Sequence, residues 1–402
     1  MAAVRNTKRR IAAAIATATT VALAVGALAL PAQAAQPEGR ILHAGAAEAV
    51  PGSYIVTLKQ SAGIKASTAQ GKQLITGYGG QIKRTYTSAL NGYAAKLSTA
   101  AAKRLAADPA VASVEQDQKV HSTATQTNAP WGLDRVDQTN LPLSGTYTYP
   151  DSAGVSTTIF VLDTGVRISH QDISGRAFNG YDFIDNDNIA QDGYGHGTHV
   201  ATTAAGTTYG VAKKAKIVAV RVLGNNGSGT TAGVIAGVDW ITANRTSSSV
   251  ANVSLGGGAS TTLDNAVRRS ISAGVTYSIA AGNSNAPASG YSPARVDTAL
   301  TIGATTRTDA RASYSNYGPV VDLFAPGSAI TAGWNNSDSA TYTGNGTSFA
   351  APHVAGAAAI YLTNHPGSSP AAVATALVNG ATNNVLTGIG TGSPNKLLKI
   401  VP

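Results

Sequence analysis

The stretch TIFVLDTG, residues 158–165, joins a continuous apolar run to an acidic residue and then to a glycine. An uninterrupted apolar run of this length is typical of a strand buried on both faces, as the strands of parallel sheets are. Four similar runs follow it along the chain. The expected strands are 158–162, 217–223, 250–255, 275–280 and 299–302, and the expected helices include 231–244, 262–273 and 348–362. This alternation predicts an α/β domain with a mainly parallel sheet.

Two further segments place a reactive side chain where a helix is expected to begin. The stretch DGYGHGTHV, residues 192–200, carries the His196 imidazole from a glycine-rich loop into a helix. The stretch GNGTSFAAPHVAG, residues 344–356, places the Ser348 hydroxyl at the start of another helix. Because ligand sites in open parallel sheets lie at the carboxyl ends of strands, we expect Asp163, His196 and Ser348 to meet there.

An acid, a base and a hydroxyl are the groups that turn a weak oxygen nucleophile into a strong one. In this hypothesis Asp163 orients His196, which takes the proton of Ser348 and later donates it to the leaving amine. Ser348 attacks the carbonyl carbon and forms an acyl-enzyme. Backbone N–H groups at the start of its helix help to stabilise the developing oxyanion.

Each of these residues has a simpler interpretation. Alone, Asp163 would be a turn residue at a strand end and Ser348 a helix cap. Asp-Thr-Gly also occurs in aspartic peptidases, but these need two such carboxylates and the chain has one Asp-Thr-Gly. The zinc pattern His-Glu-x-x-His is absent, so we expect His199 and His353 to be packed, hydrogen-bonded residues. The Gly-x-Ser-x-Gly elbow of esterases is not matched, since Ala350 replaces its last glycine.

With the three motifs in the order Asp, His, Ser, residues 129–402 resemble the subtilisin-like serine peptidases, most closely the proteinase K and aqualysin group. The resemblance implies a three-layer subtilisin-like domain that hydrolyses peptide bonds of proteins with broad specificity. It also implies that Asn283 donates a side-chain N–H to the oxyanion. Two glycine-rich segments resemble those that flank a bound peptide in this family by strand addition. Their expected substrate-binding residues are Gly224, Gly227, Gly229, Ser254, Leu255, Gly256 and Gly257.

Structural calcium is the expected cofactor, because hard oxygen ligands are what calcium requires. Residues 131–138 are very similar to a calcium-holding segment of the aqualysin group. The first expected site consists of Asp134, Asp137, Gln138, Ser144 and Thr146. A second site, of the proteinase K type, would use Asp322 with backbone carbonyls near Asp297 and Ala299.

Two other features bear on metal binding. The acidic residues Asp182, Asp185 and Asp187 lack EF-hand spacing and are interpreted as a solvated turn. The chain contains no cysteine, whereas members of this family often carry disulfides. We therefore hypothesise that calcium stabilises this chain in place of the disulfides found in other members.

Residues 1–34 have the pattern of a secretory signal peptide. A basic start is followed by an apolar run over 11–30, then by Pro31 and the small residues of Ala32-Gln33-Ala34. This order predicts cleavage after Ala34 or Ala35 and an extracellular protein. The alternative is a membrane anchor, since the apolar run is about long enough to span a bilayer.

Residues 35–123 are expected to form a propeptide with an α+β unit at about 51–120. The expected strands are 53–59, 89–98 and 111–115, with a helix at 100–107 capped by Thr99. This unit resembles the inhibitory propeptides of the same family. The resemblance implies self-cleavage just before Ala124, which leaves a peptidase domain at 124–402. The alternative is an unrelated secretion spacer.

The net charge of +9 lies entirely in the N-terminal part of the chain. Residues 1–123 contain 14 basic and five acidic residues, and residues 124–402 contain 15 of each. We therefore expect a peptidase domain with no nucleic-acid partner and no stable membrane association, which works as a monomer on proteins and peptides and is inhibited by its own propeptide. The rival functions are a serine esterase and an inactive, peptide-binding pseudo-peptidase.

Overall fold

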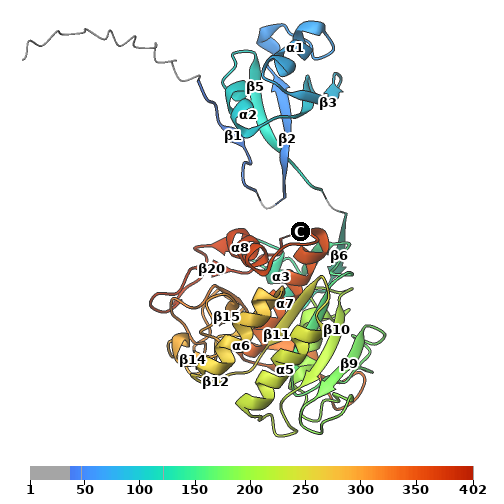
Figure 1. The fold of residues 1–402 in the computed structure, drawn as a ribbon, viewed down its shortest axis with the longest axis vertical. Coiled ribbons are helices and arrows are strands. Elements are labelled where there is room, and N and C mark those ends of the chain that lie inside the picture. The colour runs from blue at the N-terminus through green and yellow to red at the C-terminus, as the bar shows by residue number, and fades with distance from the viewer. Residues whose placement is uncertain (1–36, 47, 121, 402) are drawn as a thin grey trace, which may run out of the picture. The chain divides into compact units, whose positions relative to one another are not determined.

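A computed structural model describes residues 37–46, 48–120 and 122–401 (Figure 1). The predicted signal peptide lies outside these residues. The described chain divides into two compact units, one comprising residues 37–42 and 54–114 and the other 43–53 and 115–401. Across the described residues no helix combines the length and the apolar character needed to cross a membrane.

The smaller unit contains a five-stranded sheet in the order β1-β5-β2-β4-β3 and two helices that share its core. Its elements are β1 (Ile41–Leu42), β2 (Ala49–Leu58), a 3-10 turn (Gln60–Ala62), α1 (Ala69–Gly77), β3 (Gln81–Tyr86), β4 (Gly92–Lys96), α2 (Thr99–Ala106) and β5 (Val111–Gln118). The fold is α+β, as predicted.

Local details of this unit differ from the sequence expectations. Helix α1 and strand β3 were not predicted, because α1 contains two glycines and buries only Gly71 and Ile75, which leaves almost no apolar periodicity. The cap of α2 is Ser98 rather than Thr99. Ser98 has extended backbone angles, and its hydroxyl accepts from the Ala101 N–H at 3.2 Å. The expected strand 89–98 starts only at Gly92, because the Asn91 side chain bonds the backbone of Ile64 and Ala66.

The larger unit is built on a nine-stranded sheet in the order β19-β20-β16-β15-β13-β11-β8-β10-β9. Its strands are β8 (Thr158–Asp163), β9 (Ala177–Asp182), β10 (Lys216–Arg221), β11 (Ser249–Val253), β13 (Val275–Ala280), β15 (Leu300–Thr305), β16 (Leu323–Pro326), β19 (Thr382–Asn383) and β20 (Lys396–Leu397). Every neighbouring pair is parallel except β19 and β20. The mainly parallel sheet is confirmed.

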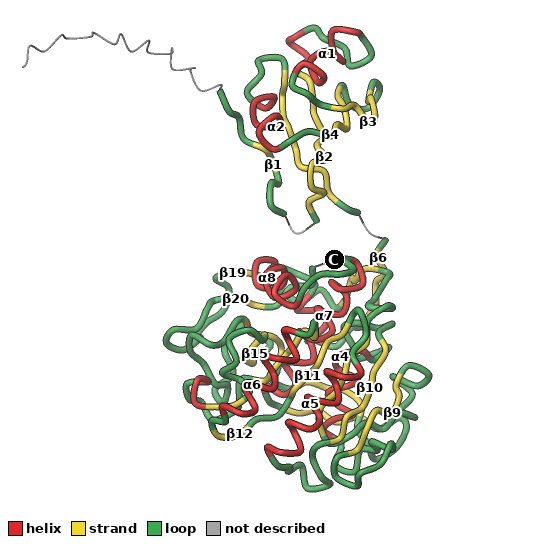
Figure 2. Tube along the Cα trace, in the orientation of Figure 1, coloured by secondary structure: helices red, strands yellow, loops and turns green. Residues whose placement is uncertain are grey.

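Two layers of helices cover this sheet, because each central strand is apolar on both faces. In β8, Ile159 and Val161 join one core cluster while Phe160 and Leu162 join the other. The first cluster includes α4 (His196–Ala205), α7 (Thr347–Asn364) and α8 (Pro370–Gly380), with α3 (Trp131–Val136) beside them. The second includes α5 (Thr231–Asn244) and α6 (Thr261–Ser272), which lie side by side (Figure 2). The three-layer domain is therefore confirmed.

Three small antiparallel sheets complete the larger unit. They pair β6 (Thr123–Thr127) with β7 (Thr146–Pro150), β12 (Gly257–Gly258) with β14 (Tyr291–Ser292), and β17 (Ile330–Gly333) with β18 (Thr341–Gly344); a 3-10 turn (Ala288–Gly290) precedes β14. They lie outside the nine-stranded sheet.

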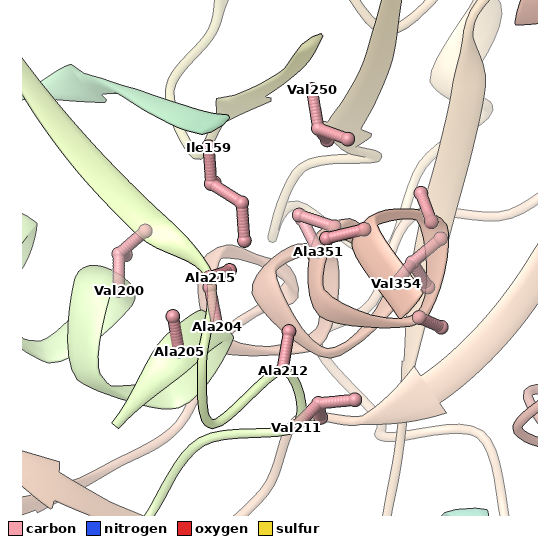
Figure 3. Close-up of a cluster of buried hydrophobic side chains, with 14 of the residues drawn as sticks. Ile159, Val200, Ala204, Ala205, Val211, Ala212, Ala215, Val250, Ala351 and Val354 are labelled. Carbon is pink, nitrogen blue, oxygen red and sulfur yellow. The ribbon is translucent and has the colours of Figure 1, made fainter. Parts of the chain in front are cut away.

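Helices α4 and α7 approach closely because small residues line their contact (Figure 3). A Cβ atom on Gly356 would lie 2.6 Å from the Ala204 carbonyl oxygen, so only glycine fits there. Figure 3 shows Ala204, Ala205 and Ala351 gathered with Ile159 and Val250 of the sheet. This close packing sets the first turns of α4 and α7 near the same strand ends.

Strand β8 lies between β10 and β11, where the order of the strands along the chain changes direction. In open parallel sheets such a switch point leaves a crevice at the carboxyl ends of the strands. Asp163, the last residue of β8, stands at this crevice.

A buried ion pair ties α3 to the loop after β15. The Arg135 guanidinium donates to both carboxylate oxygens of Asp309 at 2.7 and 2.9 Å, and its side chain is fully buried. We predict that Asp309→Ala lowers the free energy of unfolding by about 3–5 kcal/mol, because it leaves a buried charge without its counter-ion. Urea unfolding of the purified protein measures this loss.

The matched control is Asp151→Ala, which removes an exposed ion pair with Lys214 and should change the unfolding midpoint little. Equal effects of the two substitutions would contradict the prediction.

Candidate active site

The polar residues singled out in the sequence lie at the carboxyl edge of the nine-stranded sheet or at helix starts next to it. Asp163 ends β8, and His196 is the first residue of α4. Ser348 is the second residue of α7. Ser254 directly follows β11, and Asn283 lies three residues beyond β13.

Asp163 and His196 form a direct hydrogen bond. The distance from His196 Nδ1 to Asp163 Oδ1 is 2.7 Å, and Asp163 is fully buried. The same carboxylate oxygen accepts from the Thr164 N–H at 2.8 Å. With the Nδ1 proton directed at Asp163, the His196 Nε2 atom is left as the base.

The surroundings of His196 act on its pKa in opposite directions. Burial alone lowers the pKa, but the charge and hydrogen bond of Asp163, together with the charge of Asp192, raise it above the usual 6.5 overall. The site therefore favours the imidazolium that forms when His196 accepts a proton.

Asp192 organises the loop that presents His196, a role that the sequence reasoning missed. Its Oδ1 accepts from the Thr164 hydroxyl and from the N–H groups of Tyr194 and Gly195, at 2.7 to 2.9 Å. Its Oδ2 accepts from the N–H and the hydroxyl of Thr198. The sequence did contain a signal for this role. The N-cap of α4 is Gly195, which has no side chain to accept from the first N–H groups of the helix, and Asp192 is an acidic residue shortly before it.

The Ser348 hydroxyl donates to the Ser254 carbonyl oxygen at 3.1 Å. No hydrogen bond joins Ser348 to His196 anywhere in the described part of the chain. The two residues are nevertheless neighbours, since the ring of Phe349 lies 5.5 Å from that of His196 between centroids. A rotation of the Ser348 hydroxyl towards His196 is therefore needed before reaction, as is common in free enzymes.

Asn283 is held at the start of α7 with a defined amide orientation. Its Oδ1 accepts from the Thr347 N–H at 2.8 Å and from the Thr347 hydroxyl at 3.0 Å. Because the oxygen is taken up in this way, the Nδ2 donors lie on the other side of the amide. A Cβ atom on Gly346 would lie 3.6 Å from Nδ2, which places these donors beside the turn that leads to Ser348.

A cleft of about 450 Å³ runs past His196 between the two predicted glycine-rich segments. Six of the seven expected substrate-binding residues line it: Gly227, Gly229, Ser254, Leu255, Gly256 and Gly257. Gly224 is not among the lining residues; its N–H and carbonyl instead close the turn of its segment with Ser228 and Gly227. Ser228 and Gly258 also line the cleft and belong to the predicted segments 224–229 and 254–258. The lining residues outside these segments, besides His196, are Thr164, Tyr194, Leu223, Thr230, Thr231, Val234, Leu263 and Ser292.

His199 and His353 are packed and hydrogen-bonded, as expected. His199 Nε2 lies 3.1 Å from the Ile330 carbonyl oxygen, and burial lowers its pKa to about 3. His353 Nδ1 lies 2.8 Å from the Phe349 carbonyl oxygen, and burial lowers its pKa to about 4. Both imidazoles are neutral at ordinary pH.

The residues of the first expected calcium site lie between the second half of α3, which carries Asp134, and the start of β7, which carries Thr146. Asp134 Oδ1 accepts from the Ser144 N–H and hydroxyl, both at 3.0 Å. Gln138 Oε1 accepts from the same N–H at 3.1 Å, and the Ser144 and Thr146 hydroxyls are 2.8 Å apart. All these side chains therefore offer oxygen atoms within one small region.

Asp137 stands beside this group with an unused oxygen. Its Oδ2 accepts from the Thr148 N–H at 2.5 Å, but its buried Oδ1 has no hydrogen-bond partner. Burial raises the Asp137 pKa to about 6, and the nearby charge of Asp134 adds to this effect. An orphaned carboxylate oxygen among other oxygen donors fits a hard cation such as calcium.

The residues of the second expected calcium site are less closely associated. Asp322 Oδ2 accepts from the Thr301 N–H at 2.7 Å, and burial raises its pKa to about 6. The exposed Asp297 carboxylate pairs with Arg268 at 3.1 Å, and Ala299 is buried just before β15. Within the described ranges, no three His, Asp or Glu side chains form a metal-binding group.

The interpretation of Asp182, Asp185 and Asp187 as a solvated turn is wrong for Asp182. Asp182 is fully buried at the end of β9 and pairs with Arg221 at 2.5 Å. Arg221 also pairs with Asp185 at 2.6 Å. Arg221 is supplied by β10, the neighbouring strand, which sequence spacing alone did not indicate.

A buried carboxylate bound to an imidazole, beside a hydroxyl at a helix start, defines the class of serine hydrolases. Residues 154–395 match the Subtilase family, and residues 53–123 match the Peptidase inhibitor I9 family. The chain therefore belongs to the subtilase family and is a serine proteinase that carries an I9 inhibitor segment.

Similar proteins agree with this membership. The chain is 48% identical to an extracellular serine proteinase of Thermus sp. (strain Rt41A), over 92% of this chain and 94% of the relative. It is 47% identical to the alkaline serine exoprotease A of Vibrio alginolyticus, over 87% and 67% of the two chains. The crystal structure of a cold adapted subtilisin-like serine proteinase matches with a TM-score of 0.67 and 51% identity, covering 69% of this chain and all of the other.

The raised pKa of His196 gives a prediction for the pH dependence of activity. With His196 as the expected general base, which must be neutral to accept a proton, kcat/KM should fall as the pH drops through a value above 6.5. Asp163→Asn removes the charge that raises this pKa, so the acid limb should move to lower pH while activity falls by about 10⁴-fold. Peptide hydrolysis measured from pH 5 to 10 tests both effects. If the acid limb stays at the same pH in Asp163→Asn, the assignment of that limb to His196 is refuted.

Proposed function

We propose that Asp163, His196 and Ser348 form the catalytic triad of a secreted serine endopeptidase. The observation that carries this proposal is the hydrogen bond of 2.7 Å between the fully buried Asp163 and the partly exposed His196, next to the first turn of the helix that bears Ser348. In the mechanism, Asp163 holds the Nδ1 proton of His196, and Nε2 removes the hydroxyl proton of Ser348. Ser348 Oγ attacks the peptide carbonyl, and His196 then protonates the leaving amine.

Asn283 is proposed as a side-chain donor of the oxyanion hole. Thr347 holds its oxygen, so the Nδ2 hydrogens are free to meet a carbonyl oxygen placed beside Ser348. The backbone N–H groups at the start of α7 add to the stabilisation of the negative charge. Loss of one such donor typically lowers kcat by about 10²–10³-fold.

Peptide substrates are proposed to bind in the cleft as an added strand. The segments around Gly227–Gly229 and Ser254–Gly257 leave backbone groups accessible, because their glycines carry no side chain. Recognition through the backbone suits unfolded or flexible proteins and a broad specificity. The apolar lining residues Leu223, Val234 and Leu263 offer additional contact to apolar side chains of the substrate.

The precursor is proposed to consist of a signal peptide at 1–34, an inhibitory propeptide at 35–123 and the peptidase at 124–402. The I9 match at residues 53–123 supports the second of these segments. One relative that is named an extracellular serine proteinase supports secretion. The mature enzyme, with 15 basic and 15 acidic residues, is proposed to act as a monomer without nucleic-acid or stable membrane association.

Calcium is proposed as a structural cofactor. Asp134, Asp137, Gln138, Ser144 and Thr146 would hold the first ion, and Asp322 with the carbonyls near Asp297 and Ala299 a second. Bound calcium would supply charge to the orphaned Asp137 oxygen and cross-link a loop in a chain that has no disulfide.

Substitution of the nucleophile tests the proposed function. We predict that Ser348→Ala accumulates as a precursor that remains uncut near residue 123 and has no proteolytic activity, because self-cleavage uses the same hydroxyl. Electrophoresis and mass spectrometry of the secreted protein measure the cut. Normal maturation of Ser348→Ala would overturn the mechanism, and wild-type activity on esters but not on proteins would favour an esterase.

Removal of calcium tests the cofactor. We predict that a chelator lowers the thermal midpoint of the inhibitor-inactivated mature protein, and that this decrease is smaller in Asp137→Asn, which weakens the first site. Asp185→Asn is the control, since Asp185 is acidic and exposed but belongs to neither proposed site. An unchanged midpoint in the wild type with chelator would rule out the proposal.

A further inference from the structure

Helix α7 contains a proline one turn after the nucleophile. In an α-helix each N–H donates to the carbonyl four residues earlier, and proline has no N–H. Pro352 lies inside α7, four residues after Ser348. The carbonyl of Ser348 therefore lacks its regular helical donor, the N–H four residues later.

Ser254 supplies the missing donor from the neighbouring strand end. Its hydroxyl donates to the Ser348 carbonyl oxygen at 2.8 Å, although the two residues are 94 positions apart. Ser254 is only 3% exposed, so its side chain is largely shielded from water. Loss of the Ser254 hydroxyl would remove the donor that replaces the missing i+4 N–H, at a partly buried carbonyl.

Asn252 sets the direction of this hydrogen bond. Its Nδ2 donates to the Ser254 hydroxyl oxygen at 2.8 Å, and Asn252 is fully buried in β11. With its oxygen accepting from Asn252, the Ser254 hydroxyl keeps its own proton for Ser348. A chain of hydrogen bonds thus runs from the sheet to the backbone of the nucleophile.

The bond between the two serines is reciprocal. While the Ser254 hydroxyl holds the Ser348 carbonyl, the Ser254 carbonyl accepts from the Ser348 hydroxyl at 3.1 Å. Ser254 therefore fixes the backbone of the nucleophile and also receives its side chain in the free enzyme. Both contacts are made to Ser348 itself, the residue proposed to attack the substrate.

We propose that Ser254 is a positioning residue for Ser348, required because Pro352 removes the helical hydrogen bond of the nucleophile's carbonyl. This role belongs to the Ser254 side chain and is separate from its place in the lining of the cleft. It rests on the proposed function of Ser348. A displaced carbonyl would move Ser348 Oγ relative to His196 and the oxyanion donors, which lowers the rate of attack more than the binding of substrate.

A double-mutant cycle tests the dependence on Pro352. In Ser254→Ala, kcat per titrated active site should fall about tenfold to a hundredfold, with KM changed by less than about threefold. In Pro352→Ala the new N–H can bond the Ser348 carbonyl. The same Ser254→Ala substitution in that background should then lower kcat less than about threefold. Hydrolysis of a peptide substrate well below the thermal midpoint gives both values.

Ser278→Ala is the matched control. The Ser278 hydroxyl is buried and also donates to a carbonyl of α7, that of Ala351, at 2.8 Å. That carbonyl has a helical donor of its own, because residue 355 is alanine. Ser278→Ala should therefore leave kcat within about twofold of the reference enzyme in both backgrounds.

Equal losses of kcat from Ser254→Ala in the two backgrounds would overturn the proposal, as would a lower thermal midpoint with unchanged kcat. Ser254→Ala could fail to mature. In that case two other variants should mature: Ser254→Thr, which keeps the hydroxyl, and the double variant Ser254→Ala/Pro352→Ala. Failure of both to mature overturns the proposal. Activity that survives Ser348→Ala would instead refute the proposed function itself, so the two failures are distinguishable.

Discussion

The hydrogen bond between Asp163 and His196 is the interaction on which the rest of the site depends. It requires a carboxylate without access to water, and the end of β8 provides this because neighbouring strands and helices bury it completely. It also requires that α4 begin at one defined place. Asp192 secures that beginning through five hydrogen bonds to Thr164, Tyr194, Gly195 and Thr198.

Helix α7 meets a different constraint, because it bears Ser348 in its first turn and is buried along most of its length. Alanine and glycine allow it to lie against α4 and the sheet, and Gly356 has no room for a side chain. A helix held this firmly can contain Pro352 and still keep Ser348 in place. The hydroxyl of Ser254 donates to the Ser348 carbonyl in place of the missing backbone N–H and links this turn of α7 to the end of β11.

Much of this architecture was predictable from the pattern of apolar residues along the chain. Strands buried on both faces are continuous apolar runs, so β8, β10, β11, β13 and β15 were found to within a few residues. The motifs around Asp163, His196 and Ser348 indicated the strand ends and helix starts that the structure shows. Helix α1 was missed because its pattern is weak, and Ser98 was overlooked as a cap because the neighbouring Thr99 is also a capping residue type.

The sequence by itself determined the order of buried strands and helices, the two units and the set of candidate residues, since these follow from local apolar patterns and short motifs. Only the tertiary structure decided which polar atoms meet. The partners of Asp182, Asp192 and Ser348 come from other segments, up to 94 positions away. Hydrogen bonds depend on distance and direction in space, and separation along the chain contains neither.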